Sequence, residues 1–305
     1  MIIGKEVPGM PKGPKGTGIF TRGDREAYAM IAPFFLFFIV FVLIPIGINI
    51  INSFTNYNLD TKKWVGLRNY ARLFRDRYFL RSMRNTAVYA VFSVIPLVII
   101  GFVAAMVVKR QTRAMFAARA LLMFPYVTSM VAVSMVWLYL FEPTNGILNK
   151  LLEVVGIPGK KWLFDENLAL PCLIAVNIWK NVGYVMIIFL AGLAAIPKEL
   201  YEAGRVDGAG DFRMLFSITI PCVRPVTVFV VTTMCIEAFK TFDQVNIMTN
   251  GGPLNSTTTV VHQIYVRAFT EFQMGYASAM SVVLLILVFL ITYVNLRMGS
   301  GGDVE

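Results

Sequence analysis

The stretch AYAMIAPFFLFFIVFVLIPIGINIINSFTNYNL, residues 27–59, contains no charged residue in 33 positions. The hydrocarbon core of a bilayer is about 30 Å thick, so a helix that crosses it needs roughly 20 mostly apolar residues. Five further stretches are nearly as apolar: residues 85–108, 120–141 and 272–296 contain no charge, residues 167–197 contain only Lys180, and residues 214–236 contain only Arg224. The sequence therefore predicts an all-α integral membrane protein with six transmembrane helices.

The composition agrees with this class. Hydrophobic residues make up 57% of the 305 positions and charged residues 15%, with a mean hydropathy of +0.65. Soluble domains contain about 25% charged residues. We interpret the net charge of +10 as attraction to anionic membrane lipid rather than as a nucleic-acid surface. The scattered Cys172, Cys222 and Cys235 predict neither a disulfide framework nor a metal site.

Positive charge alone does not fix the orientation of the six spans. An even number of spans places both termini on one side, and the two sets of loops and tails contain 13 Lys and Arg residues each. Many of those on the second side lie in residues 66–84, where apolar residues recur near helical spacing opposite the arginines: Leu67, Tyr70, Leu73, Phe74 and Phe79. We expect one amphipathic helix here, either lying at the interface with its apolar stripe in lipid or simply connecting to the second span.

Residues that break helices occur inside several of the predicted spans: Pro33, Pro45, Pro96, Pro125, Gly183 and Gly192. Within a bundle, neighbouring helices can satisfy the backbone groups that such residues free, and irregular backbone can line a cavity. This favours a transporter or channel over a single-span anchor. No inverted internal repeat of the kind used by many secondary transporters is visible.

The most informative segment joins the fourth and fifth spans: IPKELYEAGRVDGAGDFRMLFSITIPCVRP, residues 196–225. Pro197 suits the first turn of a helix, and Glu199 and Glu202 are acidic residues near that N-terminus, where the helix dipole favours them. Gly204, Gly208 and Gly210 permit a sharp turn and close approach of another surface. The pattern predicts a compact helix–turn–helix at the membrane surface, which is either a docking element or an ordinary ordered loop.

This segment resembles the loop of the permease subunits of ABC importers, which reads Glu-Ala-Ala, three residues, Gly, nine residues, Ile, any residue, Leu, Pro. The chain has Glu202-Ala203-Gly204, then Gly208, Ile218 and Ile220-Pro221 at the same spacing. Gly204 replaces the second Ala and Ile220 replaces Leu. A glycine at position 204 is expected to make the docking helix less stiff.

The resemblance implies the type I ABC importer permease fold, in which this loop is cytoplasmic and inserts a short coupling helix into a cleft on an ATPase subunit. It assigns coupling to residues 197–213, with these contact residues: Glu202, Ala203, Gly204, Asp207, Gly208 and Ala209. The implied partners are a second permease subunit, two copies of an ABC ATPase and an extracytoplasmic sugar-binding protein, besides membrane lipid. ATP is bound by the ATPase, so we expect no cofactor in this chain.

The implied location is the bacterial cell membrane, crossed several times, with both termini in the cytoplasm. We then expect a flexible cytoplasmic tail over residues 1–26 and the first transmembrane helix with an extracytoplasmic interfacial helix over 27–84. A five-helix core with the coupling loop follows over 85–296, and a cytoplasmic tail over 297–305. The Gly/Pro/Lys-rich residues 1–26 have no apolar run typical of a signal peptide.

Other segments resemble carbohydrate permeases of the maltose/oligosaccharide or glycerol-phosphate type. They are LRNYARLFRDRYFLRSMRNT at 67–86, FDQVNIMTNGGPLNSTT at 242–258, IYVRAF at 264–269 and MGYASAMS at 274–281. The sequence contains no GxxxxGK[ST] motif, so hydrolysis of ATP by this chain is not expected. His262, the single histidine, lacks Ser or Asp neighbours at a useful spacing and is interpreted as a solvated loop residue. The protein is therefore not expected to be an enzyme.

Charged and strongly polar residues inside spans are costly and usually face the bundle interior or a wet cavity. The candidates lie in spans three, four and five: Tyr126, Ser129, Asn177, Lys180, Asn181, Tyr184, Glu237, Lys240 and Thr241. Amides, carboxylates and aromatic rings suit a sugar, and the corresponding stretches of sugar permeases line the substrate cavity. Either these side chains contact substrate or they pair with one another, as Glu237 and Lys240 could at i, i+3.

The function expected from these observations is that of a permease subunit of an ATP-driven ABC importer, which translocates a sugar, most simply an oligosaccharide. A permease for a non-sugar solute such as glycerol phosphate is the alternative. A stand-alone secondary transporter or channel would need an acidic relay or filter deep in the spans and no coupling loop, and a membrane-bound enzyme would need a catalytic cluster. Neither pattern is seen.

Overall fold

A computed structural model describes residues 22–110 and 112–300 of the chain. Most of the tail predicted over residues 1–26, and residues 301–305 of the C-terminal tail, lie outside this range. Within it the chain is helical, and its β pairing is limited to an isolated antiparallel bridge between Thr55 and Trp64. The chain divides into two compact units, residues 1–49 and residues 50–305, which are described separately.

The first unit carries most of the first predicted span, whose helix ends at Ser53, after the boundary at residue 49. Helix α1 (Arg22–Phe38), a π-helical segment (Ile39–Leu43) and α2 (Ile44–Ser53) follow one another without a break. Residues Ala27–Ser53 are long and apolar enough to cross a membrane. Large apolar side chains such as Met30, Phe37 and Phe41 are each more than 60% exposed. Such a helix without covering protein suits a lipid environment.

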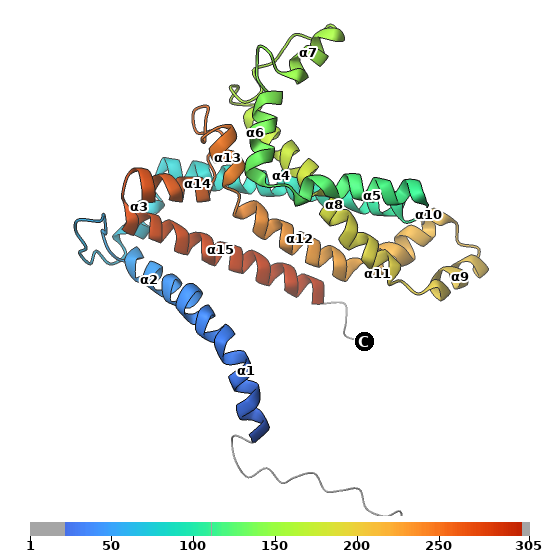
Figure 1. Ribbon diagram of the computed structural model, residues 1–305, viewed down its shortest axis with the longest axis horizontal. Coiled ribbons are helices and arrows are strands. Elements are labelled where there is room, and N and C mark those ends of the chain that lie inside the picture. Colours follow the sequence, from blue (N-terminus) through green and yellow to red (C-terminus); the bar gives the residue numbers. More distant parts are fainter. Residues whose placement is uncertain (1–21, 111, 301–305) are drawn as a thin grey trace, which may run out of the picture. The chain divides into compact units, whose positions relative to one another are not determined.

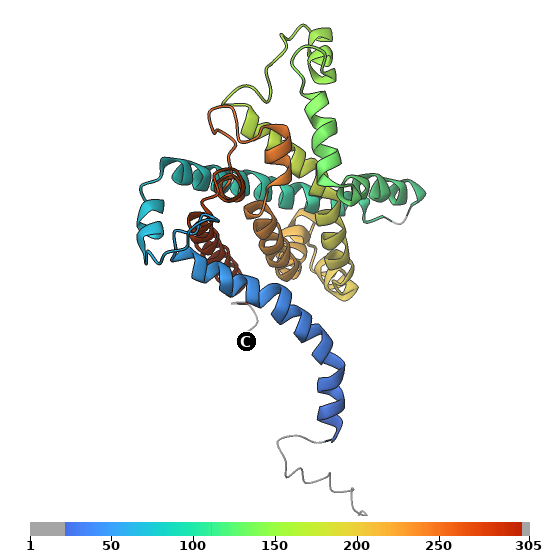
Figure 2. The same ribbon diagram turned by 60° about the vertical axis from the view of Figure 1, so that its left-hand side comes forward.

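The second unit contains the remaining helices. They are α3 (Arg68–Leu73), α4 (Arg77–Val108), α5 (Arg113–Val127), α6 (Met130–Leu140), α7 (Ile147–Val154), α8 (Ala169–Ala194), α9 (Lys198–Val206), α10 (Asp211–Met214), α11 (Ile220–Cys222), α12 (Arg224–Phe239), α13 (Asp243–Met248), α14 (Val260–Tyr265) and α15 (Met274–Ser300). π-Helical segments precede α11 (Leu215–Thr219) and α15 (Val266–Thr270). In Figures 1 and 2, α7 projects away from the other helices of this unit, whereas α6 packs against α13.

Among the residues that the structure describes, four helices have the length and composition of a membrane span: the N-terminal one, α4, α8 and α15. Two bent pairs pass the same test together, α5 with α6 and Asp211–Cys222 with α12, and each bent pair counted as one span gives six. The two pairs bend by 98° and 62°. The six predicted apolar segments are each helical, and those over residues 120–141 and 214–236 are bent pairs of helices rather than continuous ones.

The helix breakers act unequally. Pro96 lies inside the continuous α4, and Gly183 and Gly192 lie inside the continuous α8. A Cβ at Gly183 would overlap the carbonyl group of Leu122, so this glycine permits the close approach of α5 rather than breaking α8. The expectation of a break at the two glycines is corrected, because the backbone of a helix tolerates glycine when neighbours pack against it.

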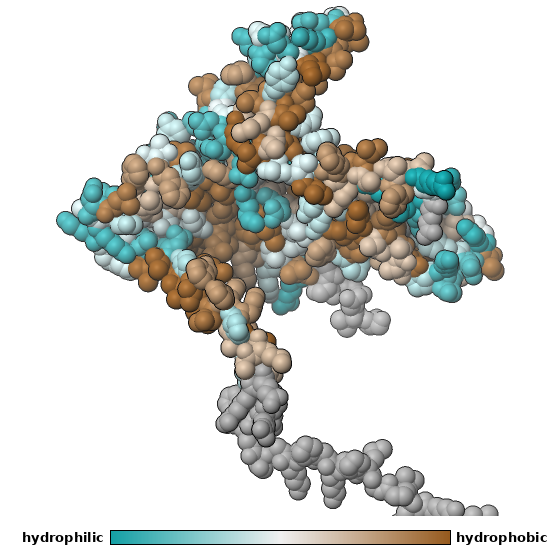
Figure 3. All heavy atoms as spheres, in the orientation of Figure 1, coloured by the Kyte–Doolittle hydropathy of each residue, from teal (hydrophilic) through white to brown (hydrophobic). Residues whose placement is uncertain are grey.

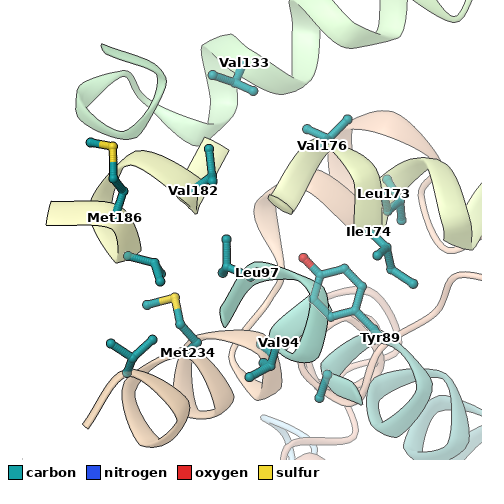
Figure 4. Packing of buried hydrophobic residues seen from close by; sticks show 14 of the residues in the cluster. Tyr89, Val94, Leu97, Val133, Leu173, Ile174, Val176, Val182, Met186 and Met234 are labelled. Atoms are coloured by element: carbon teal, nitrogen blue, oxygen red, sulfur yellow. The ribbon is translucent and has the colours of Figure 1, made fainter. Parts of the chain in front are cut away.

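The core of the second unit lies where α4, α8 and α12 pack together. Figure 4 shows Leu97 of α4, Met186 of α8 and Met234 of α12 converging beside Tyr89. These side chains are at most 5% exposed. A long helix with one face buried against two others and the opposite face apolar is typical of a membrane bundle.

Residues 66–84 form two helices instead of the one predicted. Asp76 lies between the two helices. It is the N-cap of α4 and accepts hydrogen bonds from the backbone N–H groups of Tyr78 (2.9 Å) and Phe79 (3.4 Å). Leu73 and Phe79 are 1% and 4% exposed, and they pack against protein. The expectation that this apolar stripe lies in lipid is wrong for these two residues, because α14 and α15 cover them.

The same Asp76 joins the start of α4 to the last helices. Its carboxylate accepts a hydrogen bond from the Tyr276 hydroxyl (2.7 Å) and pairs with Arg267 (3.4 Å). Burial alone would raise the pKa of the Asp76 carboxyl. The hydrogen bonds from Tyr276, Tyr78 and Phe79 and the charge of Arg267 outweigh burial and lower the pKa below its usual value.

His262 is also not the solvated loop residue that was expected. It lies in α14 with 3% of its surface exposed, and its Nε2 atom is 3.3 Å from Oδ1 of Asn250. Burial lowers the pKa of the imidazole. A sequence pattern could not show this burial, because the covering residues come from the preceding connection around Gly251.

Hydrophilic residues gather over α7 and at the two ends of the second unit, near α3 and near α9 and α10 (Figure 3). Between those ends the visible surface is largely apolar. Exposed apolar side chains on α4 and α15 include Phe92, Ile99 and Phe289, which are 57–66% exposed. This distribution, polar ends and an apolar middle, suits a bundle that crosses a bilayer.

Candidate functional site

The first candidate site is built around the break between α5 and α6. Helix α5 has 15 residues and would extend only about 22 Å at 1.5 Å per residue. Thr128 and Ser129 then adopt extended backbone with ψ of 152° and 136°, and α6 leaves at 98° to α5. The Thr128 hydroxyl donates to the Pro125 carbonyl at 2.6 Å. The chain therefore turns sharply inside an apolar segment.

Lys180 of α8 satisfies the carbonyl groups that this turn frees. Its ammonium donates to the carbonyl oxygens of Pro125 (3.1 Å), Tyr126 (3.0 Å) and Thr128 (2.7 Å). An ammonium has three N–H donors and each has a partner here. The last carbonyl groups of a helix have no partner within the helix and carry partial negative charge, so a cation stabilises this end.

Two tyrosines stack directly beside this ammonium. The rings of Tyr126 and Tyr184 have centroids 4.6 Å apart and lie within 14° of parallel. The Lys180 Nζ atom lies 5.8 Å from the centroid of the Tyr126 ring. Both rings are partly exposed in the chain. The stack is therefore accessible in part, and Tyr184 also packs against the core of this unit.

Polar groups of α8 and α12 lie near the stack. The Asn181 amide donates to the Asn177 side-chain oxygen and carbonyl, both at 2.9 Å. Glu237 lies near the C-terminal end of α12, and its carboxylate pairs with Lys240. We name five residues the translocation face, with Lys180 beside it: Tyr126, Asn177, Asn181, Tyr184 and Glu237.

The remaining predicted substrate residues have other surroundings. Lys240 pairs with Glu237 at 3.2 Å, and both side chains are about 60% exposed. The Thr241 carbonyl accepts a hydrogen bond from the Thr259 hydroxyl at 3.0 Å. Ser129 is exposed at the start of α6 and makes no capping hydrogen bond there. The structure thus brings spans three and four together at the tyrosines, and Thr241 lies instead against the start of α14.

The second candidate site is the coupling segment, residues 197–213. Pro197 precedes α9, and α9 ends at a left-handed Gly208 with φ +73°. The N–H of Ala209 bonds to the Gly204 carbonyl (2.8 Å) and that of Gly208 to the Arg205 carbonyl (3.0 Å). This pair of bonds is the Schellman motif that closes helix C-termini. The predicted helix–turn–helix is therefore present, with α10 beginning at Asp211.

Packing fixes α9 against the membrane helices. A Cβ at Gly204 would lie 3.2 Å from Ile218 Cδ1 and 3.6 Å from Met214 Cγ. Gly204, Gly208 and Ile218 belong to the same sequence motif. The nine residues between Gly208 and Ile218 let the chain turn back, so that Ile218 packs against α9. The Tyr201 hydroxyl lies 2.9 Å from the Thr219 hydroxyl, and Lys109 Nζ lies 5.3 Å from the Tyr201 ring.

The outer side of the segment is open. A cavity of about 570 Å³ lies between α9, α10 and the end of α4, lined by residues that include Lys109, Glu202 and Arg205. Val206 and Phe212 are 88% and 75% exposed. Glu202 and Asp207, the two charged residues among the predicted contacts, form no ion pair within the part of the chain that the structure describes. An exposed apolar pair beside charged residues suits docking of another protein.

Sequence reasoning missed several residues of both sites. Tyr201, Val206 and Phe212 were not singled out, although apolar residues in a short charged loop are a signal for docking. Trp179 is 43% exposed beside Lys180, and its ring meets Trp137 of α6 edge-on at 5.5 Å. No local pattern could reveal that contact, since it depends on the direction in which α6 leaves the bend.

Comparison with known proteins extends these observations. Residues 97–299 match the model of the family described as binding-protein-dependent transport system inner membrane component. The chain belongs to this family. The expectation of an ABC importer permease with a type I fold is thereby confirmed, and a permease is a transport component rather than an enzyme.

Two relatives show how similar the permease is to known transport proteins. The diacetylchitobiose uptake system permease protein NgcF of Streptomyces coelicolor is 34% identical over 289 residues, which cover 88% of this chain and 81% of that protein. The sn-glycerol-3-phosphate transport system permease protein UgpA of Yersinia pestis biovar Antiqua is 32% identical over 279 residues, covering 88% and 92%. The similarity therefore includes most of the length of both relatives.

A solved structure has the same fold. One chain of a bacterial alginate ABC transporter, in complex with its alginate pentasaccharide-bound periplasmic protein, superposes on the permease with a TM-score of 0.82. The match covers 92% of this chain and 95% of that one at 21% identity. At this identity the likeness establishes the fold, and it agrees with a multi-pass inner membrane component.

Proposed function

We propose that this permease translocates a neutral oligosaccharide across a bacterial cell membrane as one half of a heteromeric importer. The observation that carries the sugar assignment is the translocation face. Stacked aromatic rings beside amide and carboxylate groups offer both an apolar platform and hydroxyl-binding groups. A second permease would close this open face into a cavity. Tyr126, Asn177, Asn181, Tyr184 and Glu237 are the proposed contacts, with Ser129, Lys240 and Thr241 at its margin.

A neutral sugar is favoured over glycerol phosphate by the state of the two lysines. The Lys180 ammonium donates its three hydrogen bonds to backbone carbonyl groups, and Lys240 is paired with Glu237. An anionic substrate would lose its hydration on entering this face and would meet no unpaired cation of the face in exchange. Burying a charge without a partner is costly. NgcF is named for a neutral disaccharide and UgpA for an anionic solute, so the relatives span both choices.

The coupling segment supports ATP-driven transport. We propose that α9 and the turn at Gly208 dock on an ATPase subunit through Glu202, Ala203, Gly204, Asp207 and Ala209, with Val206 and Phe212 adding apolar contact. ATP binds to that subunit. A binding protein outside the membrane delivers the sugar, and two ATPase copies and a second permease complete the importer. In support, one solved structure of the same fold is an ABC transporter in complex with a periplasmic protein.

Reconstitution tests this proposal. The complete importer in proteoliposomes, with ATP inside and the loaded binding protein outside, should take up N,N′-diacetylchitobiose or a maltooligosaccharide but not sn-glycerol 3-phosphate. Without the ATPase subunit, uptake should be lost. ATP-independent uptake by the permease alone would favour a secondary transporter, and preferential uptake of sn-glycerol 3-phosphate would overturn the neutral-sugar assignment.

The proposed docking requires both termini and the coupling segment to be cytoplasmic. A phosphatase reporter that is active only outside the cytoplasm should be silent when fused at the C-terminal end and active when inserted near Gly159, after α7. A second reporter, active only in the cytoplasm, should give the reverse pattern. Phosphatase activity at the C-terminal end would contradict the proposed orientation.

A further inference from the structure

Lys180 is an ionisable residue in the middle of a long apolar helix. It is 9% exposed, and its neighbours Val176 and Val182 belong to the core. A charge inside a membrane segment is costly unless it finds partners, so such a residue normally has a function. Its partners are all on one structural feature, the end of α5.

The three carbonyl groups that Lys180 binds are those that the α5–α6 break exposes. Two of them, from Tyr126 and Thr128, lie on either side of Val127, the last residue of α5. Without Lys180 the carbonyl oxygens of Tyr126 and Thr128 would lack this donor in an apolar environment, and the backbone would have to adopt another conformation. The ammonium therefore holds the turn in the observed conformation.

The same side chain connects this turn to the stacked tyrosines. Lys180 and Tyr184 are four residues apart on α8 and so lie on one side of that helix. Lys180 binds the backbone of Tyr126, while Tyr184 stacks on its ring. Gly183, between them in the sequence, lets the α5 backbone approach closely enough for both contacts. One face of α8 thus fixes the backbone and the ring of Tyr126 together.

We propose that Lys180 is a positioning residue, whose bonds to the end of α5 hold Tyr126 against Tyr184 in the orientation that binds the sugar. This inference rests on the proposed function of the translocation face, and it replaces direct contact between Lys180 and the substrate. Three donors facing three carbonyl groups leave none for a ligand. Lys180 acts on the sugar through Tyr126.

A double-mutant cycle on the complete importer in proteoliposomes tests this inference. The variants are Lys180→Met, Lys180→Arg, Tyr126→Ala and Lys180→Met with Tyr126→Ala, and Lys150→Met on the exposed side of α7 is the matched control. Lys180→Met should raise the KM for sugar uptake by about tenfold, because a charge-assisted contact is lost. ATP hydrolysis at saturating loaded binding protein should change less than twofold. Lys180→Arg should recover most of the loss, and Lys150→Met should behave like the unmodified protein.

The cycle distinguishes positioning from general support of the fold. If Lys180 acts through Tyr126, the double variant should have the same KM as the worse single variant. If the effects of the two single substitutions on KM multiply in the double variant, the inference is overturned. It is also overturned if Lys180→Met lowers only the amount of assembled complex and leaves the KM unchanged. An unchanged KM in Tyr126→Ala would instead contradict the proposed translocation face, so the two failures are distinguishable.

A direct measurement of geometry covers the case in which Lys180→Met does not assemble. Cysteines replace Tyr126 and Tyr184 in a chain whose three native cysteines are substituted, with either Lys180 or the milder Lys180→Gln. A short bifunctional thiol reagent should join positions 126 and 184 several-fold faster when Lys180 is present. Equal rates would overturn the inference, because the position of Tyr126 would then not depend on the ammonium.

Discussion

Gly208→Val is expected to lower ATP-driven uptake by at least about tenfold, while the protein still inserts and assembles with its second permease. Gly208 has a φ of +73°, and the space around it is open, so the constraint at this position comes from the backbone and not from crowding. A β-branched residue at positive φ is a genuine outlier. The left-handed conformation costs roughly 1–2 kcal/mol for a residue with a Cβ, which would open the turn that closes α9.

Gly210 offers a matched control two residues away. It is also surrounded by open space, but its φ is −71° with ψ of 165°, a conformation that any residue adopts. Gly210→Val should therefore retain most of the uptake and most of the ATPase stimulation by the loaded binding protein. Uptake and stimulated ATP hydrolysis should be measured together. Equal activity of the two valine variants would show that the turn at Gly208 is not needed for coupling.

Tyr184→Ala is expected to reduce uptake by about tenfold or more and to shift the range of sugars carried. The substitution removes the ring that stacks on Tyr126 at 4.6 Å and one hydroxyl of the translocation face. Aromatic contacts of this kind contribute about 0.5–1.5 kcal/mol beyond burial, and the loss of the hydroxyl adds to that. Stimulation of ATP hydrolysis should persist, because the coupling segment is untouched.

Initial rates of uptake for a series of neutral oligosaccharides measure this effect. Tyr139→Ala, which removes a 61% exposed tyrosine of α6 outside the translocation face, is the control and should leave the preference among sugars unchanged. A stronger test combines alanine at Tyr184, Asn181 and Glu237. Unchanged uptake of every transported sugar by that triple variant would mean that the substrate passes elsewhere.

The predicted spans depended on a property that is local to the sequence. An uncharged, apolar run of about 20 residues is long enough to cross a bilayer as a helix. Residues 85–108 and 272–296 therefore predict membrane helices without any tertiary information. The coupling segment was equally readable, since the left-handed Gly208 and the proline entering α9 are local backbone signals. Its spacing to Ile218 also agrees with the contact that Gly204 makes there.

The partners of polar residues were not readable in this way. The sequence placed Lys180 and Tyr184 on one side of a helix, but it contained no sign that the ammonium meets the end of α5. Similarly, Leu73 and Phe79 have the spacing of a lipid-facing stripe, and α14 and α15 from the far end of the chain bury them instead. A helical pattern states which residues share a side, not what covers that side.

The sequence by itself thus determined the membrane class, the six apolar segments and the place of the coupling segment, because apolar length and turn chemistry act over a few neighbouring residues. Tertiary structure decided the 98° bend after Val127, the burial of His262 and the meeting of Tyr126 with Tyr184. Each of these depends on groups more than ten residues apart in the chain. An apolar helix gains nothing from lipid by facing one way or another, so packing against other helices selects its neighbours.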